Sequence, residues 1–142
     1  MKQLIKVFKI VLAINLLLVL IIVVVFGHKD IPLNELKIKY TNSDSSFINI
    51  EGTNVHYRDE GSSSDSIPII LIHGTGSSLH AYDIWSDNLK KSNRVIRMDL
   101  PAFGLTGPFL KRDYTISNYT TFLKEFLDSL NIKQCILVGN SL

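Results

Sequence analysis

Ile67-Pro-Ile-Ile-Leu-Ile72 runs directly into His73-Gly-Thr-Gly-Ser-Ser78, and this stretch decides the fold. A short run of apolar, largely β-branched residues is typical of a strand buried on both faces, as strands of a parallel sheet are. A turn rich in glycine and serine then ends the strand. The pattern returns twice, with Val95-Ile96 and Met98 before Asp99-Leu-Pro-Ala-Phe-Gly104, and with Cys135-Ile-Leu-Val138 before Gly139-Asn-Ser-Leu142.

Helical patterns separate these three strands. Tyr82, Trp85 and Leu89 recur at i, i+3 and i+7, which predicts a helix after the first strand. Thr115 can cap the start of a second helix, and Asn131 can take the left-handed position at its end. The apolar residues of this second helix fall on one face: Ile116, Tyr119, Leu123, Phe126, Leu127 and Leu130.

A predicted β-hairpin precedes the first buried strand. Phe47-Ile-Asn-Ile50 and Val55-His-Tyr-Arg58 each alternate apolar and polar residues, and Glu51-Gly-Thr-Asn54 between them has the composition of a turn. On this pattern His56 is expected to face solvent. The soluble part therefore opens with a hairpin and continues βαβαβ, which predicts an α/β fold with helices on the faces of one sheet.

The N-terminal residues have the pattern of a membrane-spanning helix. Residues 10–26 are an apolar run broken only by Asn15, and extending the helix to residue 7 lets it span a hydrocarbon core of about 30 Å. Lys2, Lys6 and Lys9 precede the run, so the positive-inside rule predicts a single-pass anchor with the rest of the chain outside the cytoplasm. A cleaved signal peptide is the alternative, but the apolar core is long and lacks a small-x-small cleavage site.

Composition places the remaining boundaries. We expect a membrane anchor at residues 1–27, a juxtamembrane linker at 28–45 and an α/β domain at 46–142. Without the three N-terminal lysines the chain has 12 basic and 13 acidic residues, which argues against nucleic-acid binding. Cys135, the single cysteine, is expected to be a small buried hydrophobe, and no Cys/His spacing indicates a metal site or cofactor.

Taken together, the three turns that follow the three strands resemble those of the α/β-hydrolase family, which includes esterases, lipases and C–C bond hydrolases. The resemblance covers about residues 46–142. It implies that Ser141 is the nucleophile, held on a tight strand-to-helix turn of the pattern G-x-S-x-G. Gly139 supplies the first glycine of that pattern, and the position of the second would be residue 143.

The resemblance also implies an oxyanion hole built from two backbone N–H groups. One is expected to be that of Leu142, and the other that of Thr75, with Gly76 close behind. His73 and Gly74 are expected to support this loop rather than to react. Asp99 would shape the loop after its strand, and His80 and Asp83 are interpreted as loop or helix-start residues, because in this family the acid and the histidine follow the serine.

The implied function is a membrane-anchored serine hydrolase that acts on an ester or similar small acyl compound. A C–C bond hydrolase or a peroxidase-like relative on the same fold is the alternative among enzymes. Because Ser141 is the penultimate residue, we expect the chain to be the N-terminal part of a longer protein and to be inactive by itself. A truncated, non-catalytic membrane protein is the hypothesis from another class. The strand at 135–138 would then be an exposed, apolar edge prone to aggregation.

Overall fold

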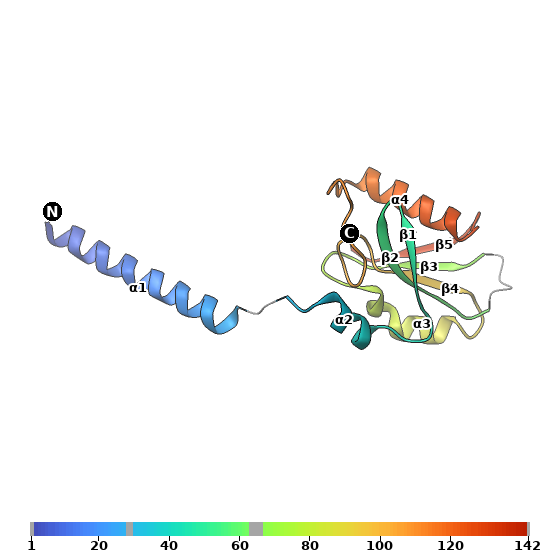
Figure 1. The fold of residues 1–142 in the computed structure, drawn as a ribbon, viewed down its shortest axis with the longest axis horizontal. Coiled ribbons are helices and arrows are strands. Elements are labelled where there is room, and N and C mark those ends of the chain that lie inside the picture. Colours follow the sequence, from blue (N-terminus) through green and yellow to red (C-terminus); the bar gives the residue numbers. More distant parts are fainter. Residues whose placement is uncertain (1, 28–29, 63–66, 142) are drawn as a thin grey trace. The chain divides into compact units, whose positions relative to one another are not determined.

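A computed structural model describes residues 2–27, 30–62 and 67–141 of the chain. The chain divides into two compact units, residues 1–32 and residues 33–142. The first unit contains one continuous helix, α1 (Lys2–Phe26) (Figure 1). Its most apolar 18 residues have a mean hydropathy of 3.1, and Asn15 donates its side-chain N–H to the Val11 carbonyl at 2.9 Å. By length and composition α1 can cross a membrane once, and a signal sequence has the same features.

The second unit is built on a five-stranded mixed sheet of order β1-β2-β4-β3-β5. The N-terminal hairpin is antiparallel, and β2 continues antiparallel onto β4. The strands β4, β3 and β5 run parallel to one another. The α/β topology predicted from the sequence is confirmed. The strands are β1 (Ser45–Ile50), β2 (Thr53–Glu60), β3 (Ile69–Ile72), β4 (Val95–Met98) and β5 (Ile136–Gly139).

Helices lie on both faces of this sheet (Figure 1). On one face α4 (Ile116–Ser129) packs Phe122 and Phe126 into the larger hydrophobic core. On the other face a short 3-10 helix, η1 (Leu79–Tyr82), leads into α3 (Asp83–Leu89) over a smaller core around Leu71. Neighbouring residues of β3 therefore belong to different cores, as expected of a strand buried on both faces.

The end signals predicted for α4 are confirmed. Thr115 Oγ1 accepts a hydrogen bond from the Asn118 backbone N–H at 3.3 Å, and Asn131 has a φ of 57°. The stripe predicted for the first helix is only partly correct, because Trp85 is 58% exposed whereas Tyr82 is buried. The chain changes from a 3-10 to an α-helix between these two residues, and the different number of residues per turn rotates Trp85 away from the sheet.

A helix that the sequence analysis missed lies within the expected linker. α2 (Leu33–Tyr40) packs on the sheet, where Arg58 Nη2 donates to the Tyr40 carbonyl at 3.0 Å. Lys37 Nζ also lies 4.5 Å from the centre of the Phe47 ring. Leu33, Leu36 and Tyr40 recur at i, i+3 and i+7, and this short stripe is the signal that could have revealed the helix.

β5 forms one edge of the sheet among the described residues, because it pairs with β3 alone. Ile136 and Leu137 are 53% and 54% exposed. Cys135, which precedes the strand, is half-buried against the larger core, and burial raises the pKa of its thiol. The exposed apolar surface of β5 agrees with the edge strand expected from the sequence.

Candidate active site

The turn after β5 has the strained backbone expected of a nucleophile elbow. Asn140 donates its N–H to the Ile72 carbonyl at 3.2 Å, which ties the turn to the end of β3. The next residue, Ser141, has a φ of 46°, in the left-handed region. A residue other than glycine there costs about 1–3 kcal/mol, and such strain is concentrated at functional sites. Gly139, at the end of β5, is where the sequence analysis places the first glycine of the motif.

The turn after β3 lies directly against this elbow. A side chain at Gly74 would collide with the backbone carbonyl oxygens of Ser141 and Asn140, so the close approach of the two loops requires glycine. The structure therefore brings together Gly74 and Ser141, which the sequence places 67 positions apart.

Two of the predicted oxyanion donors, Thr75 and Gly76, lie in the turn after β3. The Thr75 N–H donates to the Ser141 carbonyl oxygen at 3.1 Å, so it lies beside the elbow but is occupied in this conformation. To bind an oxyanion, Thr75 has to exchange that carbonyl for the substrate oxygen. Gly76 has a φ of 73°, and a side chain there would meet no neighbouring atom. Leu142, the other predicted donor, lies outside the described residues.

His73 supports the loop through both ring nitrogens. Nδ1 lies 2.8 Å from the Gly74 carbonyl oxygen, and Nε2 accepts the Leu100 N–H at 3.0 Å. A carbonyl can only accept and an amide can only donate, so the ring is the neutral tautomer with its hydrogen on Nδ1. The ring is buried, edge-on to Phe103. With both nitrogens engaged, His73 has no free nitrogen with which to take a proton from Ser141.

Asp99 links three segments of the domain. Its buried carboxylate accepts hydrogen bonds from the backbone N–H of Leu79 at 2.8 Å and of Leu105 at 2.9 Å, and it lies 2.8 Å from His56 Nδ1. Burial raises the pKa of this carboxyl, but the hydrogen bonds from His56, Leu105 and Leu79 outweigh burial and hold the pKa below its usual value. Gly104 passes so close that a side chain there would collide with the carboxylate.

The expectation that His56 faces solvent is wrong. The side chain is 0% exposed, between Asp99 and the Ser45 hydroxyl, which lies 3.0 Å from Nε2. Phe47 of β1 stacks on the ring. His56, Arg58 and Glu60 alternate along β2 and are all buried, so polarity was a misleading guide to exposure.

The family described as alpha/beta hydrolase fold matches residues 67–142. This chain belongs to that family. It is 33% identical over 92 residues to 2-hydroxy-6-oxo-2,4-heptadienoate hydrolase from Pseudomonas putida, covering 63% of this chain and 32% of the relative. It is 35% identical over 92 residues to 2-hydroxymuconate semialdehyde hydrolase from a Pseudomonas species, covering 63% and 31%.

Solved structures agree with this alpha/beta hydrolase assignment. The Cif epoxide hydrolase from Acinetobacter nosocomialis superimposes with a TM-score of 0.67 and 29% identity, covering 82% of this chain and 41% of that structure. The chain spans about a third of the length of the curated relatives above. The family assignment therefore concerns the β3–β5 part of the fold and the turns that follow each of those strands.

A buried ionic network lies on the η1 and α3 face of this alpha/beta hydrolase domain, and the sequence analysis missed it. Arg97 Nε donates to Glu60 Oε2 at 2.7 Å, and its Nη1 donates to Asp83. Asp83 in turn accepts from His80 Nδ1 at 3.1 Å. Burial raises the pKa of Glu60, but hydrogen bonds from Arg97 and Ser86 outweigh burial and hold the pKa below its usual value.

His80 lies in η1 and Asp83 is the first residue of α3, which agrees with their interpretation as loop or helix-start residues, but their side chains join this network. Burial also raises the pKa of the Asp83 carboxyl, but the hydrogen bonds from Arg97 and His80 outweigh burial. The pKa is therefore held below its usual value and the carboxyl stays ionised. Within residues 2–27, 30–62 and 67–141, no three His, Cys, Asp or Glu side chains are grouped so as to hold a metal ion.

Proposed function

We propose that this domain supplies the nucleophile of a membrane-anchored serine hydrolase acting on esters or similar acyl compounds. The observation that carries the proposal is Ser141 itself, at a φ of 46° directly after β5 and against the Gly74 turn. A serine on a strained strand-to-helix turn presents its hydroxyl at the carboxyl edge of the sheet. Family membership supports a small-molecule substrate.

The proposed chemistry is acyl transfer through Ser141. Its Oγ attacks the acyl carbon while a general base takes the hydroxyl proton, the alcohol leaves with a proton, and water then hydrolyses the acyl-enzyme. The Thr75 N–H, released from the Ser141 carbonyl, and the Leu142 N–H would hold the oxyanion.

Two of the described histidines are unavailable as the general base. His73 uses both nitrogens for the loop, and His56 uses both for Asp99 and Ser45. His80 faces Asp83 on the η1 and α3 side of the sheet. We therefore propose that a general base outside the described residues activates Ser141, because a serine without its base is a weak nucleophile.

A fluorophosphonate probe tests this proposal. The gene is read beyond codon 142, and the 142-residue chain is compared with any longer product. The longer product should be labelled, Ser141→Ala should abolish the labelling, and Ser77→Ala, in the neighbouring loop, should preserve it. Labelling of the short chain at Ser141 would show that the argument about the base is wrong. An unlabelled longer product would remove the serine hydrolase proposal.

Hydrolysis of a carbon–carbon bond is the second candidate. The two curated relatives described above are named as hydrolases of a 2-hydroxy-6-oxo-dienoate and of a 2-hydroxymuconate semialdehyde. The longer product should be assayed with such a dienoate, by loss of its absorbance, and with p-nitrophenyl acetate. Turnover of the ester alone supports acyl-ester hydrolysis, and turnover of the dienoate alone supports the second candidate.

We further propose that α1 anchors the protein with residues 28–142 outside the cytoplasm. The lysines at positions 2, 6 and 9 and the apolar length of α1 support this orientation. Protease added to spheroplasts should then digest the domain. Full protection of the domain would contradict the orientation, and a mature protein that starts near residue 28 would indicate a cleaved signal sequence instead.

A further inference from the structure

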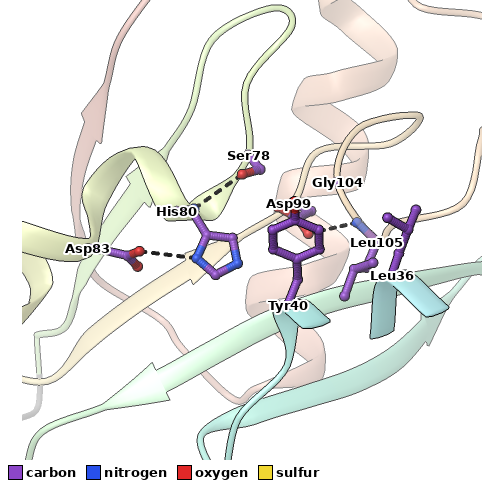
Figure 2. Close-up of a pocket in the computed structure, with 8 residues that line it drawn as sticks. All are labelled: Leu36, Tyr40, Ser78, His80, Asp83, Asp99, Gly104 and Leu105. Atoms are coloured by element: carbon purple, nitrogen blue, oxygen red, sulfur yellow. Dashed lines mark hydrogen bonds and ion pairs between the residues drawn. The ribbon is translucent and has the colours of Figure 1, made fainter. Parts of the chain in front are cut away.

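A cavity of about 530 Å³ lies between α2 and the loops that follow β3 and β4. Its wall includes Leu36 and Tyr40 of α2, Leu105 after β4, and Ser78, His80 and Asp83 around η1. Figure 2 shows these side chains, with the rings of Tyr40 and His80 next to each other and Asp83 on the opposite side of His80. Gly74 and Thr75, which adjoin the elbow, are not part of this wall.

His80 has the hydrogen-bonding atom of this cavity that a ligand could use. Its Nδ1 lies 3.1 Å from Asp83 Oδ2, and an ionised carboxylate can only accept, so Nδ1 bears the hydrogen. Its Nε2 is buried and has no hydrogen-bond partner among the described residues. A buried polar atom without a partner is destabilising, and a ligand that supplies the missing hydrogen bond recovers that loss.

The surrounding charges select a neutral ligand. Asp83 and Asp99 are ionised members of the wall, which disfavours a carboxylate or phosphate. The carboxylates in turn are already paired, Asp83 with Arg97 and Asp99 with His56, so their charges are largely compensated and give a cation little advantage over a neutral ligand. A hydroxyl can donate to the neutral imidazole and can accept from its protonated form. Leu36, Leu105 and the Tyr40 ring provide apolar surface for the rest of the molecule.

The Tyr40 ring lies next to the His80 ring in the wall of the cavity (Figure 2). Its centre lies 5.7 Å from that of His80, and the ring belongs to a short helix that contacts the sheet near its C-terminal end, through the Tyr40 carbonyl and Lys37. Because Nε2 is buried, a neighbouring side chain such as Tyr40 has to move before a ligand reaches it.

We propose that the cavity under α2 is a binding site, separate from the Ser141 site, for a small neutral alcohol whose hydroxyl hydrogen-bonds to His80 Nε2 and whose apolar part lies against Leu36 and Leu105. The inference does not depend on the proposed hydrolase activity, since Gly74, Thr75 and Ser141 are not among the residues that line the cavity.

Methyl NMR on the full chain in lipid nanodiscs tests the site. Benzyl alcohol is the probe, and the δ-methyl signals of Leu36 and Leu105 are followed. They should shift saturably with benzyl alcohol, and toluene, which lacks the hydroxyl, should bind roughly three- to tenfold more weakly. Partition of both probes into lipid is the same for every variant and gives no saturable shift at these methyl groups.

Two variants separate the hydrogen bond from the cavity. His80→Phe keeps an aromatic ring without nitrogens and should abolish the preference for benzyl alcohol over toluene. Leu36→Trp fills the cavity, leaves His80 in place and should weaken both probes at the Leu105 methyl groups. Shifts that do not saturate, equal affinity for the two probes in the wild-type chain, or an unchanged preference in a folded His80→Phe variant would each overturn the proposal.

Discussion

Replacing Asp99 by alanine should strongly destabilise the domain. The carboxylate is buried and receives three donors, His56 Nδ1 and the N–H groups of Leu79 and Leu105. Each buried donor left without a partner costs about 1–3 kcal/mol. Water can reach some of them in the cavity left behind, so we expect a loss of about 4 kcal/mol, a large part of the roughly 5–15 kcal/mol that stabilises a typical domain.

A second variant, Asp99→Asn, tests the hydrogen bonds alone because it keeps the volume of the side chain. An amide has one acceptor oxygen and brings its own donor group, so at least one of the three donors would face another donor. We expect a loss of about 2–3 kcal/mol. The matched control is Asp128→Asn, whose carboxylate is 63% exposed in an ion pair with Lys124 and should contribute less than about 0.5 kcal/mol.

Urea unfolding followed by the fluorescence of Trp85, the single tryptophan, measures these changes on the full chain in nanodiscs. The slope of the free energy against urea concentration should be the same for all variants, so that the shift in midpoint reports stability. An Asp99→Asn variant within about 0.5 kcal/mol of the wild-type chain would refute the view that this carboxylate joins the three segments.

Three further predictions use the same measurement. Arg97→Met should cost about 3 kcal/mol because it removes the main partner of the buried Glu60 charge and leaves only Lys90 Nζ, at 3.4 Å, and the Ser86 hydroxyl. Adding Glu60→Gln should recover part of that loss, and a double variant no better than the single one would contradict this. Thr115→Ala should cost about 1 kcal/mol by removing the cap on the Asn118 N–H, and no change would mean that this cap does not matter. Acid should destabilise the domain, because the pKa values of Asp99 and Glu60 are lowered in the folded state and the unfolded chain therefore binds more protons. The free energy of unfolding should be at its maximum above about pH 5 and should fall steadily below that pH. Stability that is constant between pH 5 and pH 3 would contradict the assignment of lowered pKa values.

The elements that sequence reasoning predicted correctly are those whose signals are local. The helix α4 has a one-sided apolar stripe, a threonine at its start and an asparagine at its end, and all three act within a few residues. The strand β3 is too short and too apolar to be anything but buried on both faces. The positive φ of Ser141 is also a property of a few consecutive residues, whereas the close approach of Gly74 to Ser141 joins loops that are 67 positions apart.

The buried polar groups could not be predicted in this way because their partners are distant in sequence. His56 and Asp99 are 43 positions apart, and Glu60 and Arg97 are 37 positions apart. Arg97 interrupts an apolar strand, and no residue near it in the sequence indicates that it pairs with a carboxylate on β2. Hydropathy assigns such residues to the surface, whereas pairing across the sheet allows them to be buried.

Asp99 connects the candidate active site to the cavity under α2, and this has a testable consequence. Its two oxygens hold Leu79, at the end of the loop that begins with His73 and Gly74, and Leu105, which lines the cavity. The loop beside Ser141 and the cavity wall are therefore positioned by the same carboxylate. A change that loosens Asp99 without unfolding the domain should alter both places together, whereas His80→Phe should alter only the cavity. If the methyl signals of Leu105 and the backbone signals of Gly74 both move in Asp99→Asn, and only those of Leu105 move in His80→Phe, the carboxylate is the link. If Gly74 is unaffected by Asp99→Asn, the loop beside Ser141 is held by His73 instead.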